Sequence, residues 1–157
     1  MDVLWGAWVK QVNFGRESID ISGIYQVIWK EKKGDFPFII DLHVILAYEA
    51  LQAECDKKLN TTVEIIDQDA INRIFQRNFY ITVPQGDMPL RWYEDYVFEN
   101  VEIREPGYYE LIIFIENQCK QRVPLRVVAP KMMIIDEKND IKTELWPEDL
   151  ERWEKEN

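Results

Sequence analysis

Apolar side chains occupy every second position between residues 38 and 48: Phe38, Ile40, Leu42, Val44, Leu46 and Tyr48. A period of two places all of these side chains on one face of a β-strand. The positions between them include Asp41 and His43, which are polar. This stretch therefore predicts a long strand that buries one face.

Similar alternation recurs along the chain and defines about eight candidate strands. They span residues 3–9, 19–29, 38–48, 59–65, 75–83, 96–103, 109–115 and 123–127. Turn-forming residues separate most of them, at 13–15, 33–35, 84–87, 105–107 and 116–119. Short strands at this spacing predict an all-β fold, an antiparallel two-sheet sandwich of about eight strands over residues 1–129.

Three local features of this pattern give sharper expectations. Tyr96 and Phe98 share one parity, whereas Val101 and Ile103 have the opposite one, so a β-bulge is expected at residues 99–100. The hairpin turn at residues 116–119 favours a positive φ at Asn117. The turn at 105–107 predicts a type II turn, which needs a positive φ at its glycine.

Two segments favour helix instead. Residues 47–59 are rich in helix-forming residues, so a short helical insertion is expected near 47–58. Pro147 suits the first position of a second helix, in which Trp146, Leu150 and Trp153 lie on one face at positions i, i+4 and i+7. We expect residues 130–157 to form an extension whose short amphipathic helix packs on the domain or on a partner.

Three stretches of the chain resemble one known family. They are residues 3–25, with a first hairpin and an Ile-x-Gly strand; residues 65–69, with an apolar-Asp-x-Asp strand end; and residues 105–111 with 124–128, a closing hairpin. Over about residues 3–129 the chain is similar to an uncharacterised bacterial family of small single-domain β-sandwich proteins of immunoglobulin-like or C2-like shape. Ala70 stands where the family usually has glycine. The resemblance implies a fold and assigns no activity.

Charge excludes several classes of partner. The chain of 157 residues carries 19 Lys and Arg against 29 Asp and Glu, a net charge of −10. Nucleic-acid binding and anionic membranes both need clustered basic residues, so neither is expected. No apolar run reaches the ~18 residues of a membrane span. The start of the chain does not resemble a secretion signal, and Cys55 and Cys119 make no disulfide framework, so a cytoplasmic location is expected.

Catalytic and metal chemistry find little support in the residue types. His43 is the single histidine, and zinc sites need several His or Cys ligands, so no metal or cofactor is expected. No serine or cysteine stands in a recognisable nucleophile motif, and we expect no enzymatic activity. A pair of carboxylates is the one acid–base option left. The metal alternative is Ca²⁺ at loop aspartates, as in C2-like sandwiches, with Asp67, Asp69 and Asp87 as ligands.

Aromatic residues are the distinctive excess, at 13% of the chain with six tryptophans. Aromatic side chains anchor interfaces as well as cores. Trp92, Tyr93 and Tyr96 place rings on both faces of one segment, and Ile112 and Phe114 oppose a second apolar face, so both faces need a cover.

The aromatic pattern favours one function and leaves another open. We expect a non-enzymatic protein-interaction or structural module that binds a protein partner or itself through Trp92, Tyr93, Tyr96, Trp146, Leu150 and Trp153. The alternative is a ligand-binding sandwich, with carbohydrate on Trp92, Tyr93 and Tyr96 or Ca²⁺ at the loop aspartates.

Overall fold

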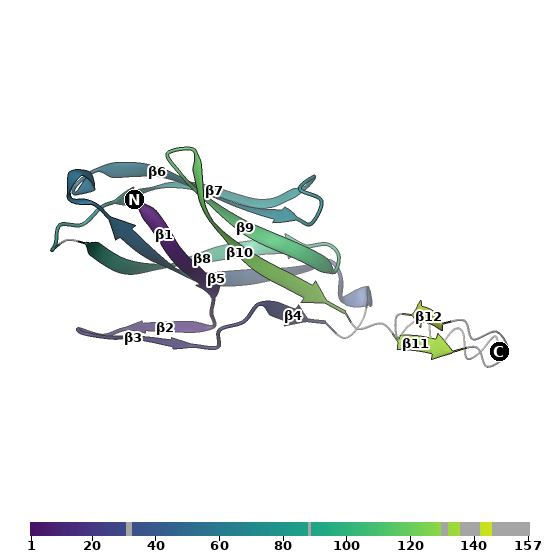
Figure 1. The fold of residues 1–157 in the computed structure, drawn as a ribbon. Coiled ribbons are helices and arrows are strands. Elements are labelled where there is room, and N and C mark those ends of the chain that lie inside the picture. The colour runs from purple at the N-terminus through teal and green to yellow at the C-terminus, as the bar shows by residue number, and fades with distance from the viewer. Residues whose placement is uncertain (31–32, 88, 130–131, 136–141, 146–157) are drawn as a thin grey trace.

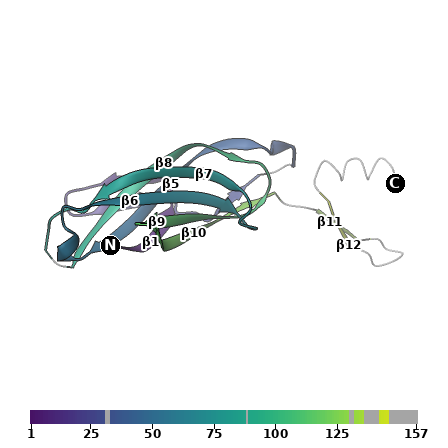
Figure 2. The same cartoon turned by 90° about the horizontal axis from the view of Figure 1, so that it is seen from above.

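The structure, a computed structural model, describes residues 1–30, 33–87, 89–129, 132–135 and 142–145. Over these residues the regular elements are strands and two 3-10 turns, with no α-helix. Two sheets pack against each other and enclose one hydrophobic core (Figures 1 and 2). The predicted all-β class is confirmed.

The strands form two large sheets and two separate hairpins. The three-stranded sheet has the order β1 (Asp2–Trp8), β5 (Phe38–Ala50), β8 (Leu90–Ile103). The five-stranded sheet has the order β4 (Val27–Trp29), β10 (Gln118–Val128), β9 (Gly107–Ile115), β6 (Lys58–Asp67), β7 (Arg73–Thr82). The hairpins are β2 (Gln11–Phe14) with β3 (Ile19–Ser22), and β11 (Met132–Ile135) with β12 (Lys142–Leu145). The β4–β10 pair is parallel, which is an exception to the predicted antiparallel arrangement.

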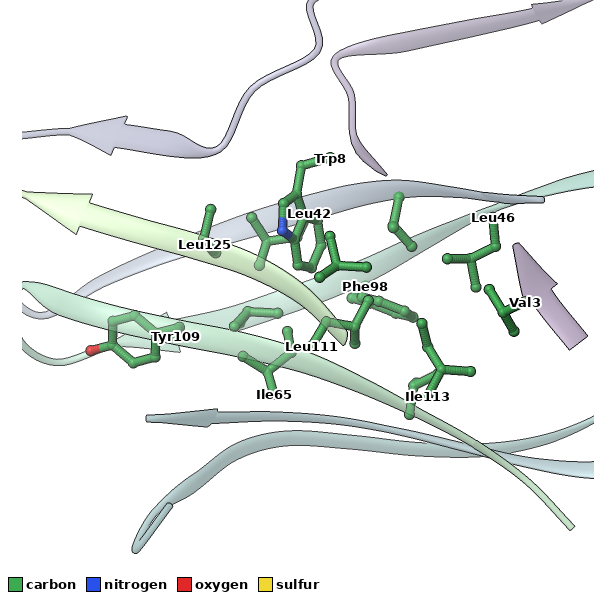
Figure 3. Packing of buried hydrophobic residues seen from close by; sticks show 14 of the residues in the cluster. Val3, Trp8, Leu42, Leu46, Ile65, Phe98, Tyr109, Leu111, Ile113 and Leu125 are labelled. Carbon is green, nitrogen blue, oxygen red and sulfur yellow. The ribbon is translucent and has the colours of Figure 1, made fainter. Parts of the chain in front are cut away.

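The core lies between the two sheets, where the apolar faces of their strands meet. Figure 3 shows side chains of both sheets in contact there, among them Leu42, Leu46, Phe98, Ile65, Leu111 and Leu125, all fully buried. Burying one side chain of this size stabilises the fold by ~1.5–3 kcal/mol. The indole Nε1 of Trp8 also donates a hydrogen bond to the carbonyl of Pro124 over 3.1 Å, and this bond ties β1 to β10.

The expected β-bulge lies at residues 99–100. Ile40 pairs with Val101 and Leu42 pairs with Phe98, so two residues of β8 oppose Asp41. Asn100 has a φ of 57°, and its backbone N–H donates to Oδ1 of Asp41 over 2.9 Å. The bulge keeps the apolar residues on both sides of it directed into the core.

The two turn predictions have different outcomes. Glu116 and Asn117 have φ values of 50° and 64°, which confirms the positive φ expected at Asn117. Gly107 also has a positive φ, at 154°. That angle is far from the about +80° of a type II turn, so the predicted turn type is wrong.

The predicted helical insertion near 47–58 is wrong. Residues 47–50 continue β5, β6 begins at Lys58, and only a 3-10 turn at Gln52–Glu54 lies between them. Leu46, Ala47, Tyr48 and Ala50 are all buried in the sheet, and this packing outweighs their helix propensity. A second 3-10 turn, Lys33–Asp35, precedes β5. The predicted C-terminal helix, with Trp146, Leu150 and Trp153, lies outside the described residues.

Candidate functional site

The aromatic residues predicted for interaction, Trp92, Tyr93 and Tyr96, lie on the two faces of β8, as their parity in the sequence predicts. Trp92 packs on Tyr48 with a centroid distance of 5.3 Å, and Tyr96 packs on Phe79 at 5.0 Å, both inside the sandwich. Tyr93 points to the opposite side and is 43% exposed. The exposed ring of this set is therefore that of Tyr93, whereas Trp92 and Tyr96 contact aromatic rings of the core.

The inward-facing tyrosines form a hydrogen-bonded chain. The Tyr96 hydroxyl donates to Glu94, and the Tyr48 hydroxyl lies 2.9 Å from that of Tyr96. Burial raises the pKa of both hydroxyls far above the ordinary tyrosine value. Both groups stay protonated at neutral pH, so they donate hydrogen bonds and do not act as bases.

Tyr93 instead pairs with an exposed tryptophan of β1. In the sheet register Trp5 is opposite Ala47 and Ala47 is opposite Tyr93, so the two rings meet above a small residue. Their centroids are 5.6 Å apart and their planes are inclined by 50°. Trp5 is 38% exposed, which leaves part of both rings open to solvent.

The β2–β3 hairpin forms the other wall of a cavity of about 570 Å³ beside these rings. Phe14, Ile19 and Ile21 of the hairpin line it together with Trp5, Trp92 and Tyr93, and we call this cavity the aromatic groove. Phe14 is 52% exposed.

The hairpin turn at residues 15–18 adds polar groups to the lining of the aromatic groove. Arg16, Glu17 and Ser18 line it, and the turn is closed by a 2.8 Å bond from the Gly15 N–H to the Ser18 carbonyl. Charged and hydroxyl groups thus stand beside an apolar floor. Ile45 and Ala47 are buried on this side of the three-stranded sheet.

Sequence reasoning missed Trp5 because β1 is irregular. The register shifts between Val3 and Trp5, so Val3 and Trp8 face the core whereas Trp5 faces outward. Regular alternation along the strand would place the side chain of Trp5 on the same, core-facing side as that of Val3. The signal was the apolar residue Leu4, which breaks the period-two pattern at the site of the shift.

Apolar residues on the outer face of the five-stranded sheet are covered differently. Ile112 is buried there and pairs with Glu64 of β6 and Arg122 of β10. Arg122 forms an ion pair with Glu110 at 2.9 Å, and Arg73 reaches Glu64 at 3.1 Å. Long charged side chains lie over this face, so it needs no second chain as a cover.

His43 lies on the outer side of the three-stranded sheet, as its parity predicts. Its Nε2 donates to Oδ2 of Asp95 over 2.7 Å, and its side chain is mostly buried. No hydroxyl or thiol in the described part of the chain hydrogen-bonds to this ring. The pair links β5 to β8 and gives no sign of a nucleophile.

The aspartates of the calcium alternative are not brought together. Asp67 binds its own turn: its Oδ1 accepts from the N–H groups of Ile71 at 3.1 Å and Asn72 at 3.3 Å, and its Oδ2 accepts from the Asn72 amide at 2.8 Å. Asp87 follows β7 at its other end, and a ten-residue strand is about 33 Å long. Asp67, Asp69 and Asp87 therefore do not form one site.

The described residues contain no group of three or more His, Cys, Asp or Glu able to hold a metal ion. No helix among them is long and apolar enough to cross a membrane.

The chain matches no protein-family model and no curated protein. The resemblance to bacterial β-sandwich proteins therefore stays a prediction. The aromatic groove is the candidate site because it joins exposed rings to a shaped cavity.

Proposed function

We propose that this chain is a non-enzymatic protein-interaction module whose partner binds in the aromatic groove. The observation that carries the proposal is the exposed Trp5–Tyr93 ring pair, set beside the β2–β3 hairpin. Aromatic side chains in a partly enclosed pocket are the usual anchors of protein interfaces. The volume of the groove, about 570 Å³, is large enough to hold a side chain.

The geometry of the rings favours a protein side chain over a sugar. Two planes inclined by 50° do not present one flat surface on which a sugar ring stacks. Phe14, Ile19 and Ile21 add an apolar wall, which suits an aliphatic or aromatic side chain. The net charge of −10 favours a partner with basic residues around that anchor.

Carbohydrate is the second candidate, carried by a different observation. Arg16, Glu17 and Ser18 place hydrogen-bonding groups beside the aromatic floor. Sugar recognition needs such groups together with a ring for stacking. The same residues serve a protein partner equally well, so the two candidates are separated by experiment.

The decisive experiment places a photocrosslinking phenylalanine analogue at position 93. The matched control is the same analogue at Tyr80, which is 70% exposed on β7 of the other sheet. A protein that crosslinks at 93 and not at 80 is purified, and its affinity for unlabelled chain is measured. Tyr93→Ala should weaken binding about tenfold or more, whereas Tyr80→Ala should leave it within about twofold.

Two results would overturn the proposal. Equal crosslinking at both positions, or equal affinity of both alanine variants, removes the groove as the docking site. Binding on a glycan array that Tyr93→Ala abolishes, without any protein crosslink at position 93, supports the carbohydrate candidate instead.

A further inference from the structure

The first half of β5 has an unpaired edge. β1 pairs with residues 44–49 of β5 and ends at Trp8, and the chain then turns away. Over residues 38–43, β5 pairs only with β8 among the described strands. The N–H of Val9 donates to the carbonyl of His43 over 2.9 Å, so the backbone of His43 points to the β1 side. By the alternation of a strand, the backbone groups of Ile39 and Asp41 point to the same vacant side.

A second strand edge faces this vacancy. β4 is an edge strand of the five-stranded sheet, and only β10 pairs with it among the described strands. Val27, Ile28 and Trp29 of β4, with Tyr25, Ile40 and His43, line a groove of about 530 Å³, which we call the lateral groove. Trp29 is 68% exposed. The lateral groove thus combines apolar walls with unpaired backbone, which is what an added strand requires.

The chain leaves the sandwich beside this groove. Val128, near the end of β10, pairs with Trp29 of β4. β11 follows after a short link and is wholly apolar in sequence, Met132-Met133-Ile134-Ile135. Its one strand partner in the described structure is β12. A lone two-stranded hairpin is marginally stable in water, so this hairpin needs a surface to bury against.

We propose that β11 of one copy adds to the β5 edge in the lateral groove of a second copy, and that the exchange is reciprocal. The four residues of β11 fit within the free edge at residues 38–43. Apolar residues then meet the apolar walls of the groove, and the backbone of Ile39 and Asp41 gains partners. The surface is separate from the aromatic groove, so this inference does not rest on the proposed function.

The position of the hairpin favours exchange over docking on its own copy. β11 and β12 lie beyond the end of β10 and apart from the two large sheets in both views (Figures 1 and 2). Residues 130–131 alone separate Ala129 from β11, so a return into the groove of the same copy leaves only two linking residues for a reversal of the chain. A second copy placed end to end meets β11 without that reversal. Reciprocal exchange closes the assembly as a two-fold dimer.

The test measures mass in solution by size-exclusion chromatography with light scattering on the full chain. We expect twice the 18.8 kDa of one chain. Ile134→Asp breaks the added strand, and Ile39→Pro removes an N–H on the vacant side; each variant alone should be monomeric. Trp29→Glu is a second groove variant in case Ile39→Pro fails to fold. Two control variants should remain dimeric. Tyr80→Glu changes a residue on β7 that is about as exposed as Trp29, and Tyr93→Ala changes a residue of the aromatic groove.

Mixing the two monomeric variants gives the signature of exchange. The Ile134→Asp copy keeps an intact groove, and the Ile39→Pro copy keeps an intact β11, so one of two dockings is restored and a dimer should reappear. Amide hydrogen exchange at Ile39 and Asp41 should slow in the dimer and speed up in Ile134→Asp.

Each other occupant gives a different result and overturns the proposal. A monomeric full chain in which Ile134→Asp speeds exchange at Ile39 and Asp41 shows that β11 docks on its own copy. A monomer whose exchange at both amides is fast and unchanged by Ile134→Asp shows that β11 does not fill the groove. A dimer that survives both single variants shows an interface elsewhere.

Discussion

Arg77 of β7 donates a hydrogen bond from Nη1 to the backbone carbonyl of Val97 in β8 over 3.4 Å. β7 and β8 are edge strands of the two sheets, and this bond crosses the open side between them. Phe75 packs on Phe98 in the same region, with a centroid distance of 4.9 Å. Arg77 shares its parity with Phe75, whose ring faces the core. A charged side chain therefore takes the inward parity on an edge strand, where the open side between the sheets leaves it exposed. Such a residue discourages pairing with another chain.

Arg77→Val should therefore expose the β7 edge to self-association. Valine favours strand pairing and removes both the charge and the bond to Val97. We expect the free energy of unfolding to change by less than ~1 kcal/mol, because the position is exposed. Sedimentation velocity at rising concentration should detect larger species than in the wild type. Gln76→Val, one residue away on the outer face of β7, is the control and should behave as the wild type does.

Ala70 occupies a backbone conformation that suits glycine. Its φ is 55°, in the turn after β6. Left-handed geometry costs an alanine about 1–2 kcal/mol, and the extra entropy of glycine in the unfolded chain offsets part of the relief. Ala70→Gly should raise the free energy of unfolding by ~0.5–1 kcal/mol in urea denaturation. Ala53→Gly, in the 3-10 turn at 52–54, lacks this relief and should give no gain; a gain there would show that glycine stabilises the chain for another reason.

Much of the architecture follows from local pattern. The alternation over residues 38–48 defines a strand because one face of β5 is continuously apolar. The parity change after Phe98 fixes the bulge at Asn100 because an extra residue reverses the faces. Both features depend on residues close in sequence, so sequence alone carries them.

Features set by distant segments were not predictable. The helix expected near 47–58 fails because both faces of β5 are buried at Ile45–Ala47, and this burial depends on segments far away in the sequence. The parallel pairing of β4 with β10 joins residues about a hundred positions apart in the chain. The aromatic groove needs the register of β1, β5 and β8 together, because Trp5 and Tyr93 meet only across Ala47. Of the residues that line the groove, Trp92 and Tyr93 were therefore predicted, whereas Trp5 and the hairpin were not.

The turn of Asp67 makes stability depend on pH in the acid range. The side-chain amide of Asn72 is the main cause that lowers the pKa of the Asp67 carboxyl, with help from the backbone N–H groups of Asn72 and Ile71. A carboxyl whose pKa is lower in the folded state stabilises the protein at pH values above its pKa in the unfolded state, which is near 4. That contribution is lost as the pH falls through the pKa of the folded state, because the carboxyl is then protonated in both the folded and the unfolded state.

Asp67→Asn should accordingly be less stable than the wild type at neutral pH, and the gap should close in acid. An asparagine still accepts the backbone bonds, but its amide nitrogen does not accept the bond from the Asn72 amide. Urea denaturation of both proteins at steps from about pH 7 to about pH 3 measures the gap. Asp69→Asn changes a carboxyl in the same turn that makes no side-chain hydrogen bond in the described structure, so its gap should be smaller throughout. A gap for Asp67→Asn that stays constant down to the acid end would show that the carboxyl's charge is not what holds the turn.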